Sequence, residues 1–355
     1  MTDKTNFTKD EWALLLRSPM NAGMAITAAE PSGLFGLLKE SFAGGAALAK
    51  VATDPNANPL VKACSKDGQF VIGFSQANNA EPYRQHVNDE LTAAAKEVPG
   101  FTLQIADGAG NVNTQTSQVD NFITQKVDIL LISPFEAAPL TPAVKRAMDA
   151  GIPVIELDRK TVGDPGKDYT AFIGGDNFKI AEEAGKFTAT KLLPDGGEAA
   201  VLEGLPSSTP AVERLNGFKE GVKGNAKIQI VAEQAADWVP DKAQTAFAAM
   251  LQAHPDIKVL YASNDMMAAG ALLAAKGAGK DVKIIGTDGL PGPAGGIEAV
   301  AKGDWAATFT YPTGAKEAID MSKKILLDCA TSVDATVTVD TTAITAENAK
   351  QLAGK

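Results

Sequence analysis

The sequence predicts an α/β fold of two similar lobes, each built on a parallel sheet, preceded by a short all-α segment. From Gln69 onward, short runs rich in β-branched residues alternate with amphipathic stretches of helix length. This alternation is typical of repeated βα units around a parallel sheet. Because the runs fall into two successive series, we expect two sheets rather than one.

The expected strands can be assigned in order along the chain. The first series covers residues 70–74, 101–105, 128–132 and 153–157, and the second covers 199–202, 228–231, 258–261 and 282–285. Two further runs, 306–310 and 336–340, follow both series. We expect the returning chain to add them as edge strands, one to each sheet.

Residues 1–60 have a different composition, rich in Ala, Leu and Gly and without a β-branched run. Thr8 and Glu11 form a capping-box pattern, and a second helical face follows Pro31. This segment is predicted to form two or three short helices. Residues 53–59 read as a turn-rich linker to the α/β part.

The composition excludes several classes of function. The 355 residues include 33 Lys and Arg and 43 Asp and Glu, which gives a net charge of -10. This negative charge disfavours nucleic acid as a partner. The two histidines, His86 and His254, and two cysteines, Cys64 and Cys329, offer little for a metal site or a catalytic triad. We expect no metal and no cofactor, and leave open whether the cysteines pair.

The most apolar stretch, residues 22–49, is broken by Glu30, Pro31, Lys39 and Glu40, so no membrane insertion is expected. Ligands of open parallel sheets sit beyond the carboxyl ends of the strands. Polar side chains follow several expected strands at this point in both halves, and we take them as candidates for a binding site. They are Asn78, Tyr83, Arg84, Asp158, Arg159, Asn264 and Asp288.

From about residue 68 to 355, the chain resembles periplasmic sugar-binding proteins of the ribose and galactofuranose type, which capture ligands for bacterial ABC importers. The segments that carry this resemblance are 74–76, 132–140, Ala150–Arg159, Arg214–Phe218, Asn264–Asp265 and Gly286–Gly289. The resemblance implies two Rossmann-like lobes of the type I periplasmic binding fold. A three-segment hinge would cross between them near residues 172, 311 and 340. Lobe I would then comprise 68–172 and 312–340, and lobe II 173–311 and 341–355.

The resemblance also implies roles for individual residues. Asp158 and Arg159 match the family's pair that binds sugar hydroxyls and the ring oxygen. A carboxylate accepts hydrogen bonds from hydroxyls, and a guanidinium group donates hydrogen bonds to hydroxyl and ring oxygens. Arg214, Asn264 and Asp288 match contacts from the second lobe, and Tyr311 falls where the family often has an amide or an acid. Trp238 lies where an aromatic packs on a sugar face, although a packing role between the lobes is an equal alternative.

The chain departs from the ribose-binding pattern at residues 80–84, where Ala-Glu-Pro-Tyr-Arg replaces a Pro-Phe-Phe segment. An aromatic followed by Arg is similar to the galactofuranose-binding branch. Tyr83 is therefore expected to stack on the ligand and Arg84 to add a third guanidinium. Asn78 is kept as a candidate, although Asn is also an ordinary turn residue.

The resemblance implies a monomeric solute-binding protein that captures a monosaccharide, a furanose being one candidate, and delivers it to an ABC transporter permease. Hinge closure around the ligand would be the mechanism. We expect no enzymatic activity, because no nucleophile elbow or phosphate loop is present. A glycosidase pair of Asp158 and Asp288 is the enzymatic alternative.

A transcription regulator and a cytosolic sugar sensor would both use the same sensor core. The regulator would place a DNA-binding headpiece in residues 1–62, but this segment holds six basic and six acidic residues and no helix-turn-helix pattern. The cytosolic sensor depends on where the protein resides. The resemblance implies the periplasm or cell envelope, whereas the N-terminus shows no basic region followed by an apolar run, which makes the cytoplasm the alternative location.

Overall fold

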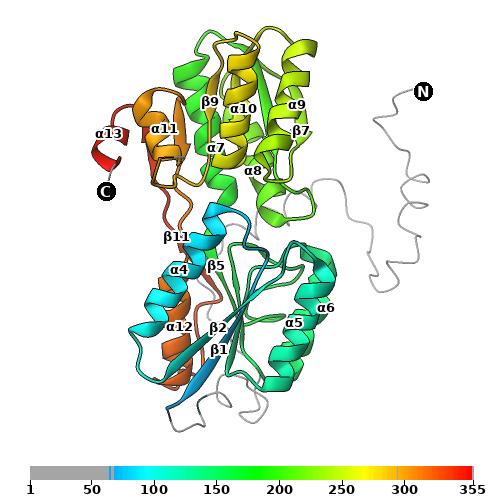
Figure 1. Cartoon of the computed structure of the whole chain (residues 1–355), viewed down its shortest axis with the longest axis vertical. Coiled ribbons are helices and arrows are strands. Elements are labelled where there is room, and N and C mark those ends of the chain that lie inside the picture. The colour runs from blue at the N-terminus through cyan, green and yellow to red at the C-terminus, as the bar shows by residue number, and fades with distance from the viewer. Residues whose placement is uncertain (1–63, 65–67, 294, 354–355) are drawn as a thin grey trace, which may run out of the picture. The chain divides into compact units, whose positions relative to one another are not determined.

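The computed structural model of the protein describes residues 64, 68–293 and 295–353. The helices and the linker expected in residues 1–60 lie outside these described residues. The elements that follow form two lobes, each with a six-stranded sheet between layers of helices (Figure 1). The predicted α/β fold of two parallel sheets is confirmed.

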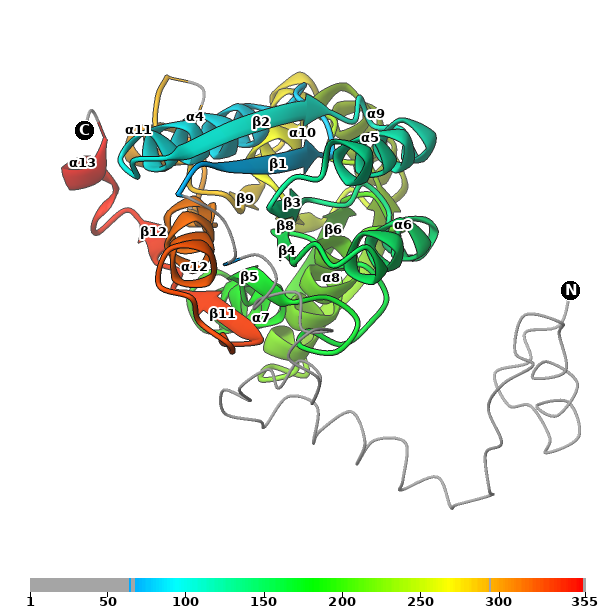
Figure 2. The same ribbon diagram turned by 90° about the horizontal axis from the view of Figure 1, so that it is seen from below.

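The first lobe contains a sheet in which all strand pairs are parallel, in the order β11-β5-β4-β3-β1-β2. Helices α4 and α12 cover one face, and α5 and α6 cover the other (Figure 2). The strands are β1 (Phe70–Gln76), β2 (Phe101–Asp107), β3 (Ile129–Ile132), β4 (Val154–Leu157), β5 (Ala171–Gly175) and β11 (Thr336–Val339). The helices are α4 (Pro82–Lys96), α5 (Val112–Gln125), α6 (Ala137–Asp149) and α12 (Ala315–Leu326).

The second lobe repeats this arrangement with the sheet order β12-β10-β9-β8-β6-β7, in which only β12 is antiparallel to its neighbour. Its strands are β6 (Gly197–Glu203), β7 (Ile228–Ala235), β8 (Ile257–Ala262), β9 (Lys283–Ile285), β10 (Ala307–Phe309) and β12 (Ala343–Thr345). Its helices are α7 (Asn177–Phe187) with the π-helical turn η2 (Thr188–Leu192), α8 (Thr209–Val222), α9 (Pro240–Ala253), α10 (Asp265–Gly277), α11 (Gly296–Lys302) and α13 (Ala349–Leu352). Helices α7 and α8 pack on one face of the sheet, and α9 and α10 on the other. None of the described helices is long and apolar enough to cross a membrane.

Local sequence explains these elements. The central strands β3 and β4 are buried at every position; β3 is a continuous apolar run, and β4 is apolar except for Glu156. Three helices begin with proline in the first turn, where its missing N–H costs nothing. The side chains of Asn111, Asp176 and Asn264 cap α5, α7 and α10 by accepting from backbone N–H groups.

Two strands were missed by the sequence prediction. β5 carries Gly174 and Gly175, which have low strand propensity, and β12 spans only three residues. The expectation that 306–310 forms an edge strand is wrong, because β12 occupies the edge and β10 lies one strand inside it. The first crossing between lobes also comes later than residue 172, since β5 completes the first sheet before α7 begins.

The structure resolves the open question about the cysteines. Cys64 and Cys329 form a disulfide with their Cα atoms 5.2 Å apart. The bridge joins the segment before β1 to the turn after α12, and spans 265 residues of sequence. Because disulfides are rare in reducing compartments, this bond fits a protein that folds outside the cytosol.

Reduction of this bond is expected to destabilise the protein. Disulfides typically contribute about 2–4 kcal/mol, in the chain-entropy account by restricting the unfolded chain. Urea denaturation with and without dithiothreitol measures the effect. The double variant Cys64→Ser/Cys329→Ser is the control and should not respond to dithiothreitol, and an unchanged wild-type midpoint on reduction would contradict the prediction.

Candidate ligand-binding cleft

Polar and aromatic side chains of both lobes meet in a cleft beyond the carboxyl ends of the strands. The space between these walls is about 380 Å³, which includes open solvent at the mouth of the cleft. The cleft is lined by Glu81, Tyr83, Arg84, Asp158, Arg159, Pro210, Arg214, Trp238, Asn264, Met266, Asp288 and Tyr311.

Nine of the ten residues that the sequence singled out line this cleft, and Asn78 does not. The Asn78 Oδ1 accepts from the backbone N of Ala80 at 2.8 Å, and its Nδ2 donates to Glu81 at 3.2 Å. Asn78 therefore shapes the turn that leads into α4. The ordinary use of Asn in turns explains why its position after a strand was misleading.

Three lining residues were missed: Glu81, Pro210 and Met266. Glu81 lies one helical turn before Arg84, and Pro210 lies four residues before Arg214 on α8. Helical spacing from the predicted arginines would have found both. Met266 carries no such signal, because its side chain is apolar and lies within an apolar helix.

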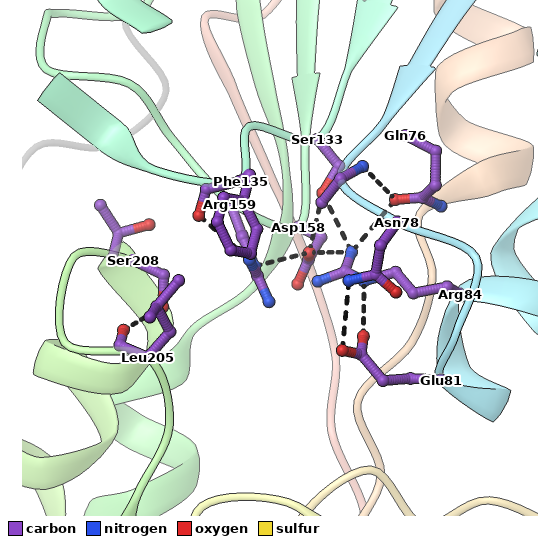
Figure 3. A network of polar contacts seen from close by, with 12 residues as sticks. Gln76, Asn78, Glu81, Arg84, Ser133, Phe135, Asp158, Arg159, Leu205 and Ser208 are labelled. Atoms are coloured by element: carbon purple, nitrogen blue, oxygen red, sulfur yellow. Dashed lines mark hydrogen bonds and ion pairs between the residues drawn. The ribbon is translucent and has the colours of Figure 1, made fainter. Parts of the chain in front are cut away.

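A buried ion pair organises the first lobe's wall (Figure 3). Arg84 Nη1 donates to Asp158 Oδ2 at 2.5 Å and to Ser133 Oγ at 3.0 Å, and Ser133 Oγ also donates to the same carboxylate oxygen. Arg84 Nε donates to Glu81 at 3.3 Å. Both Arg84 and Asp158 are almost fully buried, so the pair forms a charged floor with little access to water.

Arg159 lies beside this pair. Burial alone would raise the pKa of Asp158, but Arg84 and Arg159 outweigh it and hold the pKa below its usual value. Burial and the neighbouring Arg84 lower the pKa of Arg159 to about 10. Arg159 Nη1 donates to the carbonyl of Phe135 at 3.2 Å, while its Nε is buried without a hydrogen-bond partner.

The second lobe supplies a similar arginine and acid. Arg214 Nε donates to Asn177 Oδ1 at 2.8 Å and Nη1 to the carbonyl of Ser263 at 2.5 Å, which fixes the guanidinium 3.8 Å from Asp288. Burial and the nearby Asp265 raise the pKa of Asp288 well above its usual value, although Arg214 opposes this. Each lobe therefore presents a guanidinium from one of its helices and an acid that follows one of its strands.

Trp238 stands between the arginines. The guanidinium carbons of Arg159 and Arg214 lie 5.5 and 5.7 Å from its ring centre. Its backbone φ is +70°, a conformation that bulky residues rarely adopt. Asp158, Asp237 and Asp288 also have positive φ. Such strain gathers at functional sites when the surrounding structure holds it in place.

Three buried polar atoms of the cleft have no hydrogen-bond partner: Tyr83 Oη, Arg159 Nε and Trp238 Nε1. Native proteins satisfy most buried polar groups, so three residues with an unpaired polar atom in the lining of one cleft make it a candidate site for a polar ligand. The Tyr83 ring packs on Tyr311 with 5.4 Å between centroids, and the Tyr311 hydroxyl donates to the backbone carbonyl of Asp158. The donors are thus held in place before any ligand arrives.

The two lobes also touch each other directly at the rim of the cleft. Lys160 Nζ lies 2.9 Å from Glu213 Oε1, and the backbone N of Lys160 donates to Thr209 Oγ1 at 3.1 Å. The backbone N of Ala137 donates to the carbonyl of Ser207. The described conformation is therefore one in which the lobes have closed on each other.

The comparisons with known proteins agree with this architecture. The profile of the periplasmic binding protein domain family matches residues 72–327, more than half of the chain. The chain belongs to this family.

Two curated relatives and two solved structures are similar over most of the described residues. The ribose import binding protein of Bacillus subtilis is 37% identical, over 62% of this chain and 70% of that protein. The galactofuranose-binding protein YtfQ of Escherichia coli is 30% identical, over 62% and 72%. The fructose-binding periplasmic domain of the hybrid two-component system BT1754 superposes with a TM-score of 0.76 at 34% identity, over 80% and 93%. A Mycobacterium smegmatis protein in complex with β-D-fucofuranose gives 0.74 at 30%, over 79% and 93%.

The position of Trp238 depends on the glycine opposite it. A Cβ at Gly204 would lie 2.0 Å from the indole ring, so Gly204→Ala is expected to displace Trp238. Near-ultraviolet circular dichroism should show a changed tryptophan band. Gly224→Ala is the control, because a Cβ there would meet only Gly221 O at 3.7 Å. An unchanged spectrum for Gly204→Ala would show that the indole does not depend on this contact.

Proposed function

We propose that the protein captures a neutral monosaccharide between its lobes and delivers it to the permease of an ABC importer. The observation that carries the proposal is that Tyr83, Arg159 and Trp238, whose Oη, Nε and Nε1 atoms have no hydrogen-bond partner, all line the same cleft. Sugar hydroxyls and ring oxygens would accept from these donors. The Trp238 indole offers a flat apolar surface for ring C–H groups.

The cleft combines donors and acceptors, which suits a neutral polyhydroxy ligand. The guanidinium groups of Arg84, Arg159 and Arg214 are donors, and the carboxyl groups of Glu81, Asp158 and Asp288 offer acceptors, although the raised pKa of Asp288 favours its protonated form. A polyhydroxy compound uses both kinds of group and brings no charge into a site with little water.

Closure follows from the division of the site between lobes. Asp158 and Arg159 belong to the first lobe, and Arg214 and Asp288 to the second, while Tyr311 lies on a crossing segment between them. A ligand shifts an open-to-closed equilibrium only through contacts that are better in the closed form. A sugar that touches both walls meets this requirement.

A five-membered ring is the proposed ring form. The names of two relatives contain a furanose, galactofuranose in one and fucofuranose in the other. The Tyr83–Arg84 pair on α4, in which Arg84 is held by Asp158, is the feature of this chain that is similar to the galactofuranose-binding branch.

The proposed location is the periplasm or cell envelope. The disulfide between Cys64 and Cys329 supports export, because a reducing cytosol would keep these thiols free. Osmotic-shock fractionation of the native host tests the location, and recovery of the protein only with cytosolic markers would contradict it.

The enzymatic alternative has one observation in its favour. The pKa of Asp288 is raised and that of Asp158 is lowered, a division that glycosidases use for acid and nucleophile. Asp158 is, however, engaged by Arg84 and Ser133, which leaves it poorly placed to attack a sugar carbon. Incubation with the bound sugar and with its aryl glycoside, followed by product analysis, should show no turnover.

A thermal-shift screen over pentoses, hexoses, ketoses and polyols should identify a sugar that raises the melting temperature, because a ligand of the folded state stabilises it. Arg159→Ala should then weaken binding of that sugar by about 2–4 kcal/mol, since hydroxyls would be buried without a donor. Isothermal titration calorimetry measures the loss.

Arg146→Ala is the matched control. Arg146 lies on α6, is half exposed and pairs with Asp120 away from the cleft, so its variant should bind with wild-type affinity. Wild-type affinity in Arg159→Ala would overturn the assignment of the site.

Locked rings test the proposed ring form. The 1,4-anhydro alditol of the identified sugar keeps a five-membered ring, and the 1,5-anhydro alditol keeps a six-membered ring; neither can interconvert. We expect the five-membered form to compete for the cleft more strongly in calorimetric displacement. Stronger competition by the six-membered form would reverse the assignment and leave sugar binding itself intact.

A further inference from the structure

A carboxylate lies buried behind the first lobe's wall and does not line the cleft. Glu156 is the third residue of β4, has no exposed surface, and precedes the ligand-facing Asp158 by two residues. The proposed binding of sugar makes no direct use of it. A charged group in this position is costly, and an apolar residue of similar size would often serve stability as well or better.

The principal contacts of Glu156 go to one residue, Thr161. Glu156 Oε2 accepts from the backbone N of Thr161 at 2.9 Å, and Oε1 accepts from Thr161 Oγ1 at 2.5 Å. Thr161 is itself almost fully buried. The carboxylate therefore ties the far end of the loop 158–162 back onto the strand from which this loop leaves.

The loop held in this way carries three functional side chains in sequence. Asp158 and Arg159 face the cleft, and Lys160 reaches across the rim to Glu213 of the second lobe. The Lys160 ammonium also lies 5.0 Å from the ring centre of Phe172 on β5. A displacement of Thr161 would be passed directly to Lys160 and Arg159, because they are its immediate neighbours along the chain.

We propose that Glu156 is a positioning residue, which holds the loop 158–162 so that Arg159 meets the ligand and Lys160 meets the second lobe. This inference rests on the proposed sugar-binding function for its affinity readout. Its structural part, the restraint of Thr161 by the carboxylate, is independent of any ligand.

The electrostatic setting supports a measurable signature. Burial raises the pKa of Glu156 to about 7, although the hydrogen bonds from Thr161 oppose the shift. The groups that act on it are Lys160 on the loop and the hydroxyl of Tyr169, whose own pKa is raised by burial and by Glu156. Asp164 and Asp168, in the segment between the loop 158–162 and β5, also raise the pKa of Tyr169. On α6, Lys145 and Asp149 form an ion pair with each other.

Protonation would convert two charge-assisted hydrogen bonds into neutral ones, which are roughly half as strong. The loop should thus be held less firmly as the pH falls through 7. Folding stability should change in the opposite direction. Because the folded pKa of Glu156 lies above the unfolded value of 4.5, its protonation favours the folded state, and its contribution is lost as the pH rises through about 7.

The experiment uses two variants of the full chain. Glu156→Gln keeps one acceptor for the Thr161 N–H and one donor for Thr161 Oγ1, and so imitates the protonated acid. Glu156→Leu removes both acceptors. Hydrogen exchange without sugar should show the Thr161 amide most protected in the wild type, less in Gln and least in Leu.

Affinity is then measured between pH 6 and 8 for D-ribose, D-fructose and D-galactose, using whichever binds the wild type. Glu156→Leu should bind more weakly than the wild type at every pH. The loss should be roughly tenfold at pH 8, the order seen when hydrogen-bond partners of metal ligands are removed, and smaller at pH 6, where the wild-type carboxyl group is already largely protonated. Glu156→Gln should match the wild type at pH 6 and fall behind it at pH 8. Asp265 has a pKa raised by burial to about 6, so only the difference between the two profiles reports on Glu156.

Unchanged protection of Thr161 in both variants would overturn the proposal. Wild-type affinity in a folded Glu156→Leu would do so as well. If none of the sugars binds the wild type, those three ligands are excluded for the proposed function, and the exchange data still decide the role of Glu156.

Discussion

The contact between Arg84 and Asp158 is the interaction on which the cleft depends. It joins the first turn of α4 to the end of β4, so a single ion pair fixes two elements that are 74 residues apart in sequence. Removing Asp158 would leave Arg84 with Glu81 at 3.3 Å as its ion-pair partner, and removing Arg84 would leave Asp158 with Arg159 at 3.6 Å, so either buried charge would lose its shortest ionic contact. The pair also contacts three neighbouring side chains, those of Ser133, Glu81 and Arg159. These contacts fix the positions of the donors and acceptors that line the wall of the first lobe.

The two lobes have a similar sheet topology, and each places an arginine near an acid at the cleft. Their sheets share one strand order, and in each an arginine on a helix approaches an acid that follows a strand. The acids Asp158 and Asp288 both adopt positive φ, and both line the cleft. The electrostatic surroundings differ, however: two guanidinium groups surround Asp158, whereas Asp265 lies behind Asp288. Asp158, in the wall of the first lobe, is therefore the stronger hydrogen-bond acceptor of the two acids.

The sequence predicted the fold from local rules, and it predicted most of the cleft residues in part from strand ends and in part, for Arg214, Trp238 and Tyr311, from the family resemblance. Buried parallel strands are legible as apolar runs, and polar residues at their carboxyl ends converge by topology. The misses have physical causes as well. β5 ends in two glycines and β12 spans three residues, while the partnering of Cys64 with Cys329 is set by tertiary distance. The anchoring of Thr161 by Glu156 left no sequence pattern, since a charged residue within a strand reads as a solvated edge.

The partnerless atoms of Tyr83, Arg159 and Trp238 bear on what happens when the cleft is empty. Each buried donor without an acceptor costs about 1–3 kcal/mol, so closing on nothing carries a penalty that closing on a sugar avoids. If the protein binds a sugar as proposed, an empty molecule would therefore favour the open form, and the closed form would indicate a bound ligand. A transporter that responds to the closed form would then seldom hydrolyse ATP without a ligand to carry.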